Sequence, residues 1–260
     1  MQHTLNAIST IAYRDILKFL RDRSRIVATF IFPLVFIGIL GGSLQSNLGA
    51  NTGFNFLTFI FTGVIAQTLF QSSASGIISL IEDRENDFSQ EMFVSPISRY
   101  AIIFGKILGE SLVAYIQVIG IIIFSLFLRV PFSLHQLLLL LPAGLIACLL
   151  GGGFGVLVMS QLHTQRSANQ IFPFLLLPQF FIAGVFTPIT HLPWYLFILS
   201  RIAPMTYAVD FLRGLYYFGT PAYSKIVLYS PLVDFLIMTV LFVVMLTIGT
   251  YFFVRNERNR

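Results

Sequence analysis

Residues 54–80, FNFLTFIFTGVIAQTLFQSSASGIISL, run for 27 positions without a charged side chain. A helix needs roughly 20 mostly apolar residues to cross the hydrocarbon core of a bilayer, which is about 30 Å thick. Inside that core every backbone N–H and C=O must be paired within the helix, because water is absent. The stretch therefore predicts a membrane-spanning helix, and it indicates the class of the whole chain.

The rest of the chain has the same character. Of its 260 residues, 56% are hydrophobic and only 10% are charged, whereas a soluble domain carries about 25% charged residues. We therefore expect a single-domain, all-α polytopic membrane protein covering residues 1–260. Six stretches qualify as spans, at about 26–44, 54–80, 101–128, 134–160, 168–188 and 228–254.

Two further segments are expected to lie at the membrane surfaces. Over residues 1–25, apolar side chains fall on one helical face and basic ones on the opposite face, which predicts an amphipathic interfacial helix. An ordinary basic flank that sets the topology is equally compatible with this pattern. Residues 189–220 are apolar but broken by Pro193 and Pro204, which predicts a re-entrant outer segment; a seventh span is the alternative.

The orientation follows from the basic residues, because loops rich in Lys and Arg stay cytoplasmic. Placing both termini in the cytoplasm puts 12 of the 16 basic residues on the inner side and leaves Arg129, Arg201, Arg213 and Lys225 outside. We therefore expect a multi-pass protein of the cell (inner) membrane. Nucleic-acid binding is not expected, since no basic patch with interleaved aromatic residues stands apart from the membrane flanks.

The residue types that carry chemistry are sparse. Cys148 is the single cysteine and the four histidines are scattered, so neither a disulfide framework nor a metal site is expected. The G-x-x-x-x-G-K-[ST] phosphate loop is also missing from the sequence. We expect no cofactor on this chain and no enzymatic activity of its own. If ATP powers it, ATP and Mg²⁺ bind to another subunit.

One dense charged segment interrupts the apolar sequence. Residues 80–106, LIEDRENDFSQEMFVSPISRYAIIFGK, hold eight charged residues. Ile81, Phe88 and Met92 share one helical face, and Ser95-Pro96 ends that helix. A short helix at 81–95 could dock into a groove of a soluble partner, although a solvated loop fits the spacing equally well.

The segment EDRENDFSQEMFVSPISRYAIIFGKILGE, residues 82–110, resembles the region after the second span of type-2 ABC transporter permeases. APMTYAVDFLRG, residues 203–214, is similar to the stretch before that family's last span, and FLRDRSRIVATFIFPLVF, residues 19–36, is a weaker match. The daunorubicin-type drug-exporter branch looks most similar. Ala203 departs from the Asn usual there, and Asp87-Phe88 stands where Gly is frequent.

The resemblance implies a half-size transmembrane subunit. Such a subunit pairs with a second copy of itself and with two ATP-binding-cassette subunits in the lipid bilayer. It also implies that residues 81–95 form a coupling helix to the ATP-binding subunit. The coupling residues would be Glu82, Arg84, Glu85, Phe88, Met92, Pro96 and Arg99.

A substrate path should carry polar groups, because polar side chains are costly against lipid. Candidates are Gln67, Gln71 and Ser75, which recur every four residues, together with Gln170, Phe174 and Gln179. Amides among aromatic rings suit an amphipathic substrate. The alternative is that these amides form interhelical hydrogen bonds that only fasten the bundle.

Other patterns predict packing. Lys106 and Glu110 are spaced i, i+4, and Asp210 and Arg213 are spaced i, i+3, so each pair is expected to form a local ion pair. Asp210, Arg213 and Tyr207 would fix the outer segment. Small-residue ridges provide for close helix contacts; they are Gly38 with Gly42, and Ala143, Ala147, Gly151 and Gly155.

The leading functional hypothesis is ATP-driven export of an amphipathic, drug-like or lipid-like substrate. A polysaccharide or glycolipid export permease of the same family is an alternative. An ion-coupled secondary transporter is a rival of another class, but it calls for an ionisable residue at mid-membrane and for inverted repeats. A scaffold subunit is a further rival, and it would not need the polar stripe formed by Gln67, Gln71 and Ser75.

Overall fold

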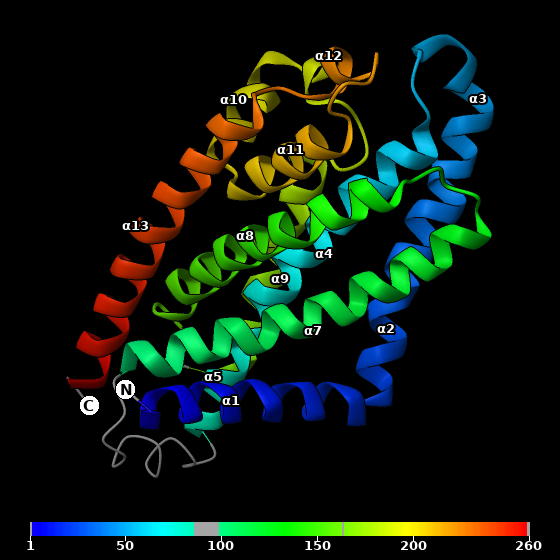
Figure 1. The fold of residues 1–260 in the computed structure, drawn as a ribbon. Helices are drawn as coiled ribbons and strands as arrows, with labels where there is room; N and C mark the ends of the chain where they lie inside the picture. Colours follow the sequence, from blue (N-terminus) through cyan, green and yellow to red (C-terminus); the bar gives the residue numbers. More distant parts are fainter. Residues whose placement is uncertain (1, 86–98, 163, 259–260) are drawn as a thin grey trace.

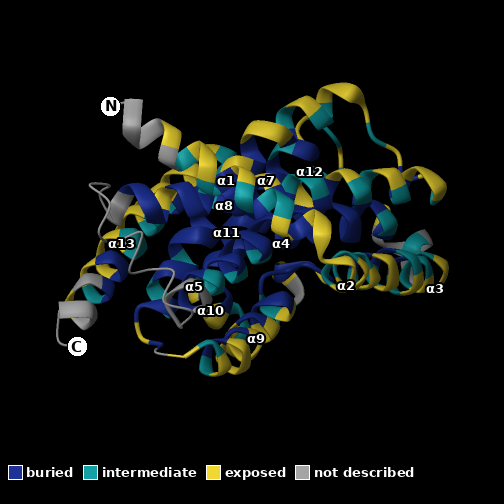
Figure 2. Cartoon of the chain, turned by 90° about the horizontal axis from the view of Figure 1, so that it is seen from below, coloured by how far each residue is buried: buried dark blue, intermediate teal, exposed yellow. Residues whose placement is uncertain are grey.

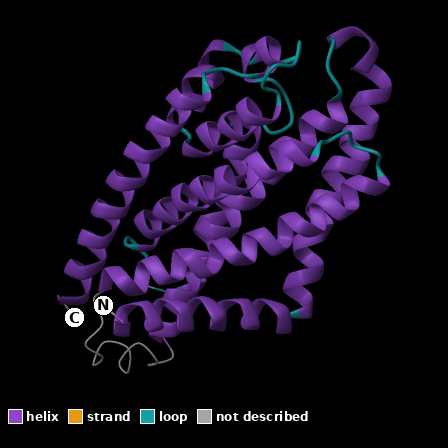
Figure 3. Cartoon of the chain, in the orientation of Figure 1, coloured by secondary structure: helices purple, strands orange, loops and turns teal. Residues whose placement is uncertain are grey.

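The computed structural model describes residues 2–85, 99–162 and 164–258, and within them the chain is helical with no strand (Figure 3), which confirms the all-α prediction. The elements are α1 (Gln2–Arg21), α2 (Arg23–Pro33), the π-helix η1 (Leu34–Gly41), α3 (Gly42–Thr52), α4 (Phe56–Gly76), α5 (Ile78–Glu85), α7 (Arg99–Phe127), α8 (Leu134–Met159), α9 (Gln165–Ile182), the 3-10 helix η2 (Ile189–His191), α10 (Trp194–Ile202), α11 (Pro204–Tyr216), α12 (Tyr223–Ile226) and α13 (Pro231–Arg258).

Five helical runs among the described residues are long and apolar enough to cross a membrane. They are Arg23–Asn47, Phe56–Ile81, Ala101–Phe127, Leu134–Met159 and Tyr223–Phe253. The number rises to six if α10 and α11, which meet at 90°, count as one broken span. The protein is therefore a multi-pass membrane protein. Both termini lie at one end of the bundle, and α3 and α12 lie at the other (Figure 1).

The predicted span at 168–188 is shorter in the structure. Helix α9 ends at Ile182 and is not among the five runs that are long and apolar enough. The chain turns just beyond it, where Gly184 adopts a φ of 80° that favours glycine. Polar residues in the first turns of α9 and the internal Pro173 and Pro178 lower its apolar length.

Asp22 separates the amphipathic helix from the first span. Its carboxylate accepts the backbone N–H of Arg25 at 2.9 Å and the hydroxyl of Ser24 at 2.7 Å, which caps α2. These hydrogen bonds hold the pKa of Asp22 below its usual value. Further along, Pro33 lacks an N–H to donate, and the helix continues from Leu34 in π geometry.

Helix α4 is the centre of the bundle, buried along most of its length, and it packs against α7, α8 and α11 (Figure 2). The ridge predicted on the fourth span makes this possible. A Cβ at Gly151 or Gly155 would overlap the carbonyl oxygen of Phe70 or Ala74, both on α4. That ridge therefore packs within the subunit.

The other predicted ridge behaves differently. A Cβ at Gly38 would lie 3.7 Å from the Phe124 ring, and one at Gly42 would meet no atom within 4 Å. Gly41 makes the closer approach instead, at 3.2 Å from Leu57. Within the described subunit Gly42 therefore makes no close contact, and Gly41, the last residue of the π-helical turn at 34–41, approaches α4 instead.

Helix α1 runs along the first half of α7, and the chain turns sharply from α1 into α2 (Figure 1). Gly105 and Gly109 allow this approach, since a Cβ there would lie 3.2 Å from the Cα of Ile8 and 2.9 Å from the Cα of Ala12. Phe19 is buried, whereas Tyr13 and Leu20 are exposed. The amphipathic helix is thus attached to the protein through its apolar face.

Candidate functional site

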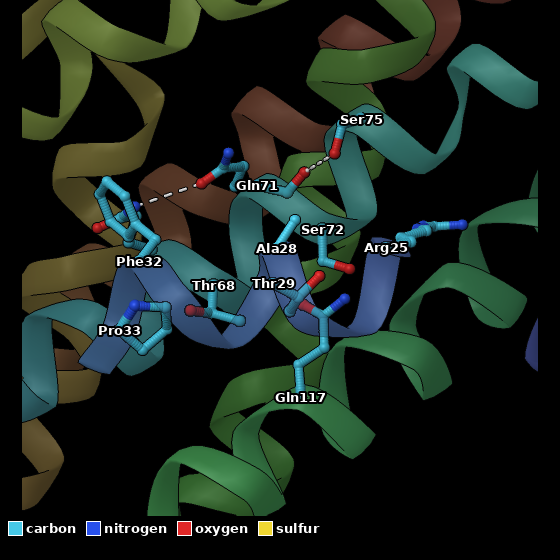
Figure 4. Close-up of a pocket in the computed structure, with 11 residues that line it drawn as sticks. Arg25, Ala28, Thr29, Phe32, Pro33, Thr68, Gln71, Ser72, Ser75 and Gln117 are labelled. Carbon is cyan, nitrogen blue, oxygen red and sulfur yellow. Dashed lines mark hydrogen bonds between the residues drawn. The ribbon is translucent and has the colours of Figure 1, made fainter. Parts of the chain in front are cut away.

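A cavity of about 290 Å³ lies between α2, α4 and α7, and we call it the polar cavity (Figure 4). Its wall combines amide and hydroxyl side chains of α4 with residues of the first and third spans. The lining residues are Arg25, Ala28, Thr29, Phe32, Pro33, Gln67, Thr68, Gln71, Ser72, Ser75 and Gln117. Three of the six predicted path residues, Gln67, Gln71 and Ser75, thus lie in one cavity.

The hydrogen bonds of these three residues stay within α4. The Gln67 amide donates to Gln71 Oε1 at 3.3 Å, and the Ser75 hydroxyl donates to the carbonyl oxygen of Gln71 at 2.6 Å. Neither bond links two helices. The geometry therefore favours a polar cavity wall over interhelical fastening.

Two polar atoms of the wall are buried without a hydrogen-bond partner among the described residues. They are Oε1 of Gln67 and Oγ of Ser72. In Figure 4 the ends of Thr29 and Gln117 gather beside Ser72 from the facing helices. Buried polar atoms are rarely left unpaired. Water or the polar part of a ligand would satisfy these groups.

A second cavity of about 270 Å³, the aromatic cavity, adjoins the first between α4, α5 and α9. It shares Gln71 and Ser75 with the polar cavity, and its other lining residues are Ile78, Asn169, Phe172, Pro173, Leu176, Leu177 and Phe180. The ring of Phe32, in the polar cavity, stands 5.7 Å from that of Phe180. The two cavities together join polar groups to an aromatic surface.

The remaining predicted path residues lie elsewhere on α9. Gln170 is exposed and the side chain of Phe174 is 83% exposed, and neither lines the two cavities. Gln179 is buried, donates to the Leu175 carbonyl at 3.1 Å and accepts the N–H of Met205 at 3.5 Å. It connects α9 to α11, so its contacts are those of a packing residue.

Sequence reasoning missed Arg25, Thr29 and Gln117 as wall residues. The sequence analysis places Arg25 among the basic residues that flank the first span. Arg25, Thr29 and Pro33 nevertheless recur every four residues and so share a helical face. Gln117 was detectable as a lone amide in an apolar span. Which helices face each other could not be read from either pattern.

A cluster of five buried or partly buried charges lies at the end of the polar cavity that holds Arg25; its members are Arg14, Asp15, Arg25, Lys106 and Glu110. Lys106 and Glu110 form the predicted i, i+4 ion pair at 3.2 Å, which is confirmed. Lys106 also contacts Asp15 of α1 at 2.7 Å, and Arg25 contacts Glu110 at 3.2 Å. Burial raises the pKa of Asp15 above its usual value, against the lowering effect of the Lys106 ammonium.

The outer segment contains Tyr207, Asp210 and Arg213 on α11, at the end of the bundle away from the termini (Figure 1). The Tyr207 hydroxyl donates to the Arg201 carbonyl at 2.7 Å. Asp210 accepts the N–H groups of Leu228 and Tyr229 at 2.9 and 2.7 Å. It thereby ties α11 to the chain entering α13.

The predicted Asp210–Arg213 ion pair is wrong. The Arg213 guanidinium instead donates to three carbonyl oxygens, those of Gly184 at 2.6 Å and of Phe59 and Val185 at 3.0 Å. It also stands 3.7 Å from the centroid of the Phe59 ring. The turn at 183–185 supplies partners to Arg213, and the loop at 228–229 supplies partners to Asp210. Each of these partners is nearer than the other charged side chain.

The predicted coupling residues are described only in part. Glu82, Arg84 and Glu85 belong to α5, and Arg99 begins α7. Phe88, Met92 and Pro96 lie outside the described residues. Helix α5 follows α4 after Ile77, so the cavity wall leads directly into this segment of the chain. The coupling role stays a prediction.

Comparison with known proteins agrees with this architecture. The family model described as ABC-2 type transporter matches residues 6–217. The chain is 28% identical over 195 residues to the putative transport permease ycf38 of Cyanophora paradoxa, covering 74% of this chain and 67% of that protein. It is 28% identical over 219 residues to the inner membrane transport permease YadH of Escherichia coli K12, covering 80% of this chain and 81% of that protein. A third relative, the probable multidrug ABC transporter permease YbhR of the same strain, is 27% identical over 141 residues, covering 54% of this chain and 38% of that protein.

Proposed function

Because this chain belongs to the ABC-2 type transporter family, we propose that it is the membrane-spanning permease subunit of an ATP-driven exporter of amphipathic compounds. Two copies assemble with two ATP-binding-cassette subunits, which bind ATP and Mg²⁺. The assembly lies in the cell (inner) membrane with both termini of the permease in the cytoplasm. In this proposal the chain itself carries out no hydrolysis.

The observation that carries the proposal is the pair of joined cavities. The polar cavity offers amides and hydroxyls whose hydrogen bonds, those of Gln67, Gln71 and Ser75, stay within one helix, and the adjoining aromatic cavity offers Phe172 and Phe180. Gln71 and Ser75 belong to both. A compound with a polar and an apolar part fits such a surface.

Transport requires that the cavity open alternately to the two sides. ATP binding in the partner can shift that equilibrium only if it favours one state over the other. The route to the cavity is short, because α4 carries Gln67 and Gln71 and leads through α5 into the proposed coupling segment. A displacement of that segment would move the cavity wall without any catalytic side chain.

Within the family we place this chain, by sequence resemblance, in the drug-exporter branch, the daunorubicin type; the branch does not fix the charge of the exported compound. Support comes from the Phe172 and Phe180 rings that line the second cavity and from the similarity over 141 residues to a permease named for multidrug transport. An export system for charged glycans would call for a path without such an apolar wall.

The test is a double substitution, Gln67→Leu with Gln71→Leu, in the complex with its ATP-binding subunit. Both side chains face a cavity, so an apolar residue of similar size costs the fold little but changes what the cavity accepts. We expect assembly, basal ATP hydrolysis and melting temperature to stay near those of the unmodified protein, while the set of exported amphipathic dyes changes.

Gln179→Leu is the matched control, because that amide links α9 to α11 and lines neither cavity. We expect it to lower the melting temperature, with a loss of roughly 1 kcal/mol, and to leave the substrate profile unchanged. A double variant that melts earlier yet exports the same compounds would contradict the proposal, since the stripe would then serve packing alone.

A further inference from the structure

Arg25 is the one charged side chain among the described residues that line the polar cavity; no acidic residue is part of the wall. It stands near the start of α2, at the end of the bundle where the termini lie, while Phe32 and Pro33 line the cavity two turns deeper (Figures 1 and 4). The wall thus changes from cationic to apolar along its length.

The polar groups near the middle of the wall are suited to donate hydrogen bonds. The Ser72 hydroxyl is buried, 7% exposed as a residue, and has no partner among the described residues. Thr29 and Gln117 bring a second hydroxyl and an amide to the same place (Figure 4). Hydroxyls, amides and guanidinium groups are the donors that bind anionic oxygens, and all three kinds line this one cavity.

Arg25 can be released to a ligand at limited cost. It contacts Glu110 at 3.2 Å, and its side chain is 33% exposed, whereas that of Glu110 is 2% exposed. Glu110 holds a second cation, Lys106, at 3.2 Å. If an anion in the cavity took Arg25, the buried Glu110 carboxylate would still be paired, which avoids the large penalty of an isolated buried charge.

We propose that the polar cavity selects amphiphiles with an acidic head group, a phosphate, carboxylate or sulfonate, which binds Arg25 in place of Glu110. The apolar body of the ligand lies against Phe32 and the adjoining Phe180. This inference rests on the proposed function and narrows it to one substrate class.

Binding is measured on the full-length permease purified with its ATP-binding subunit in dodecyl maltoside. The probe is dodecyl phosphate with a fluorescent group at the end of its chain, followed by fluorescence anisotropy. Unlabelled dodecyl phosphate should displace it. Dodecyltrimethylammonium should not, because it carries the opposite charge, and inorganic phosphate should not at the same concentration, because it lacks the apolar body.

Four variants test the role of Arg25. Arg25→Gln should weaken binding by about tenfold or more, the effect of one charge-assisted hydrogen bond, and Arg25→Lys should restore most of it. Arg23→Gln removes the same charge from an exposed side chain two residues earlier and should change nothing. Glu110→Gln should tighten binding several-fold, because it removes the competitor for Arg25.

If the Arg25–Glu110 ion pair is purely structural, Glu110→Gln should not tighten binding of the probe. Weaker or unchanged binding in that variant overturns the proposal even if Arg25→Gln fails to fold. The proposal is also overturned if Arg23→Gln loses as much binding affinity as Arg25→Gln does, or if dodecyltrimethylammonium displaces the probe. Displacement by inorganic phosphate alone would reduce the site to one for a free anion and overturn the amphiphile assignment. The proposed function is tested separately, by measuring ATP-driven export of amphipathic dyes by the unmodified complex, whatever the outcome of the binding experiments.

Discussion

At the scale of single residues, Arg213 shows how a charge is held inside this bundle. Its side chain is 2% exposed, and its guanidinium satisfies three carbonyl oxygens that a turn and a helix leave pointing at it. Gly63 makes the space, because a Cβ there would lie 2.6 Å from Nη2 of Arg213. The residue joins α4, α11 and the turn after α9 at one point.

Substituting Arg213 should therefore destabilise the protein strongly. Arg213→Met removes a charged donor from three buried carbonyl oxygens, of which that of Phe59 still accepts the Thr62 hydroxyl at 2.9 Å, and we expect a loss of roughly 3 kcal/mol or more. Arg201→Met is the control in the same segment, since Arg201 makes ring contacts of 4.5 and 4.6 Å with Phe197 and Tyr229 and should cost about 1 kcal/mol. Melting curves of the solubilised variants give the comparison. Equal shifts would show that the three carbonyl contacts contribute little.

Charged residues also show how far local spacing predicts contacts. The i, i+4 pair of Lys106 and Glu110 forms as expected, because both residues sit on one turn of one helix. Asp15 and Arg25 join it from distant positions, which no local pattern reveals. Asp210 and Arg213 share a helix too, yet their partners come from the tertiary fold.

At the scale of elements, the contact between α4 and α8 depends on glycines, which have no side chain to hold the two helices apart. Gly151 and Gly155 let α8 touch the backbone of α4, which also carries the polar stripe. The sequence predicts this ridge because small residues recur every four positions. It does not predict the π-helical η1, whose register makes Gly41 rather than Gly42 the contact residue.

Gly151→Ala should destabilise the bundle, because the new methyl group would overlap the carbonyl oxygen of Phe70, and the backbone cannot move aside as a side chain can. We expect a loss of roughly 1 to 3 kcal/mol. Gly42→Ala is the matched control. Its Cβ meets nothing within 4 Å and its backbone is helical, so a gain of up to about 1 kcal/mol is expected. The order of the two melting temperatures is the test, and a reversed order would contradict the packing described here.

At the scale of the whole molecule, the bundle has two unlike ends. One end holds both termini, α1 and the charge cluster, and the other holds α3, α12 and the outer segment (Figure 1). The sequence predicts the spans because apolar length is a local property. The cavities could not be predicted in the same way, since they depend on which helices face one another, as Arg25, Gln67 and Gln117 show.

The predicted orientation can be tested with cysteines at the two ends. Asn47 and Ser224 are exposed at the end away from the termini, so Asn47→Cys and Ser224→Cys should react with an impermeant thiol reagent added to intact cells. Ser89→Cys, in the proposed cytoplasmic segment, should react only after lysis. The native Cys148 is buried and gives little background. Labelling of Ser89→Cys in intact cells would reverse the topology.

The central claim is that the polar cavity is the substrate path, and filling it tests this most directly. Thr29→Trp would place a large ring in the cavity, whereas Val27→Trp would place the same ring on a side of α2 where Val27 is 58% exposed. The measurement is ATP-dependent uptake of amphipathic dyes into inside-out vesicles that hold the complex. We expect Thr29→Trp to lose most of its uptake while it assembles and hydrolyses ATP at the basal rate, and Val27→Trp to transport normally. Unreduced uptake by an assembled Thr29→Trp complex would contradict the claim.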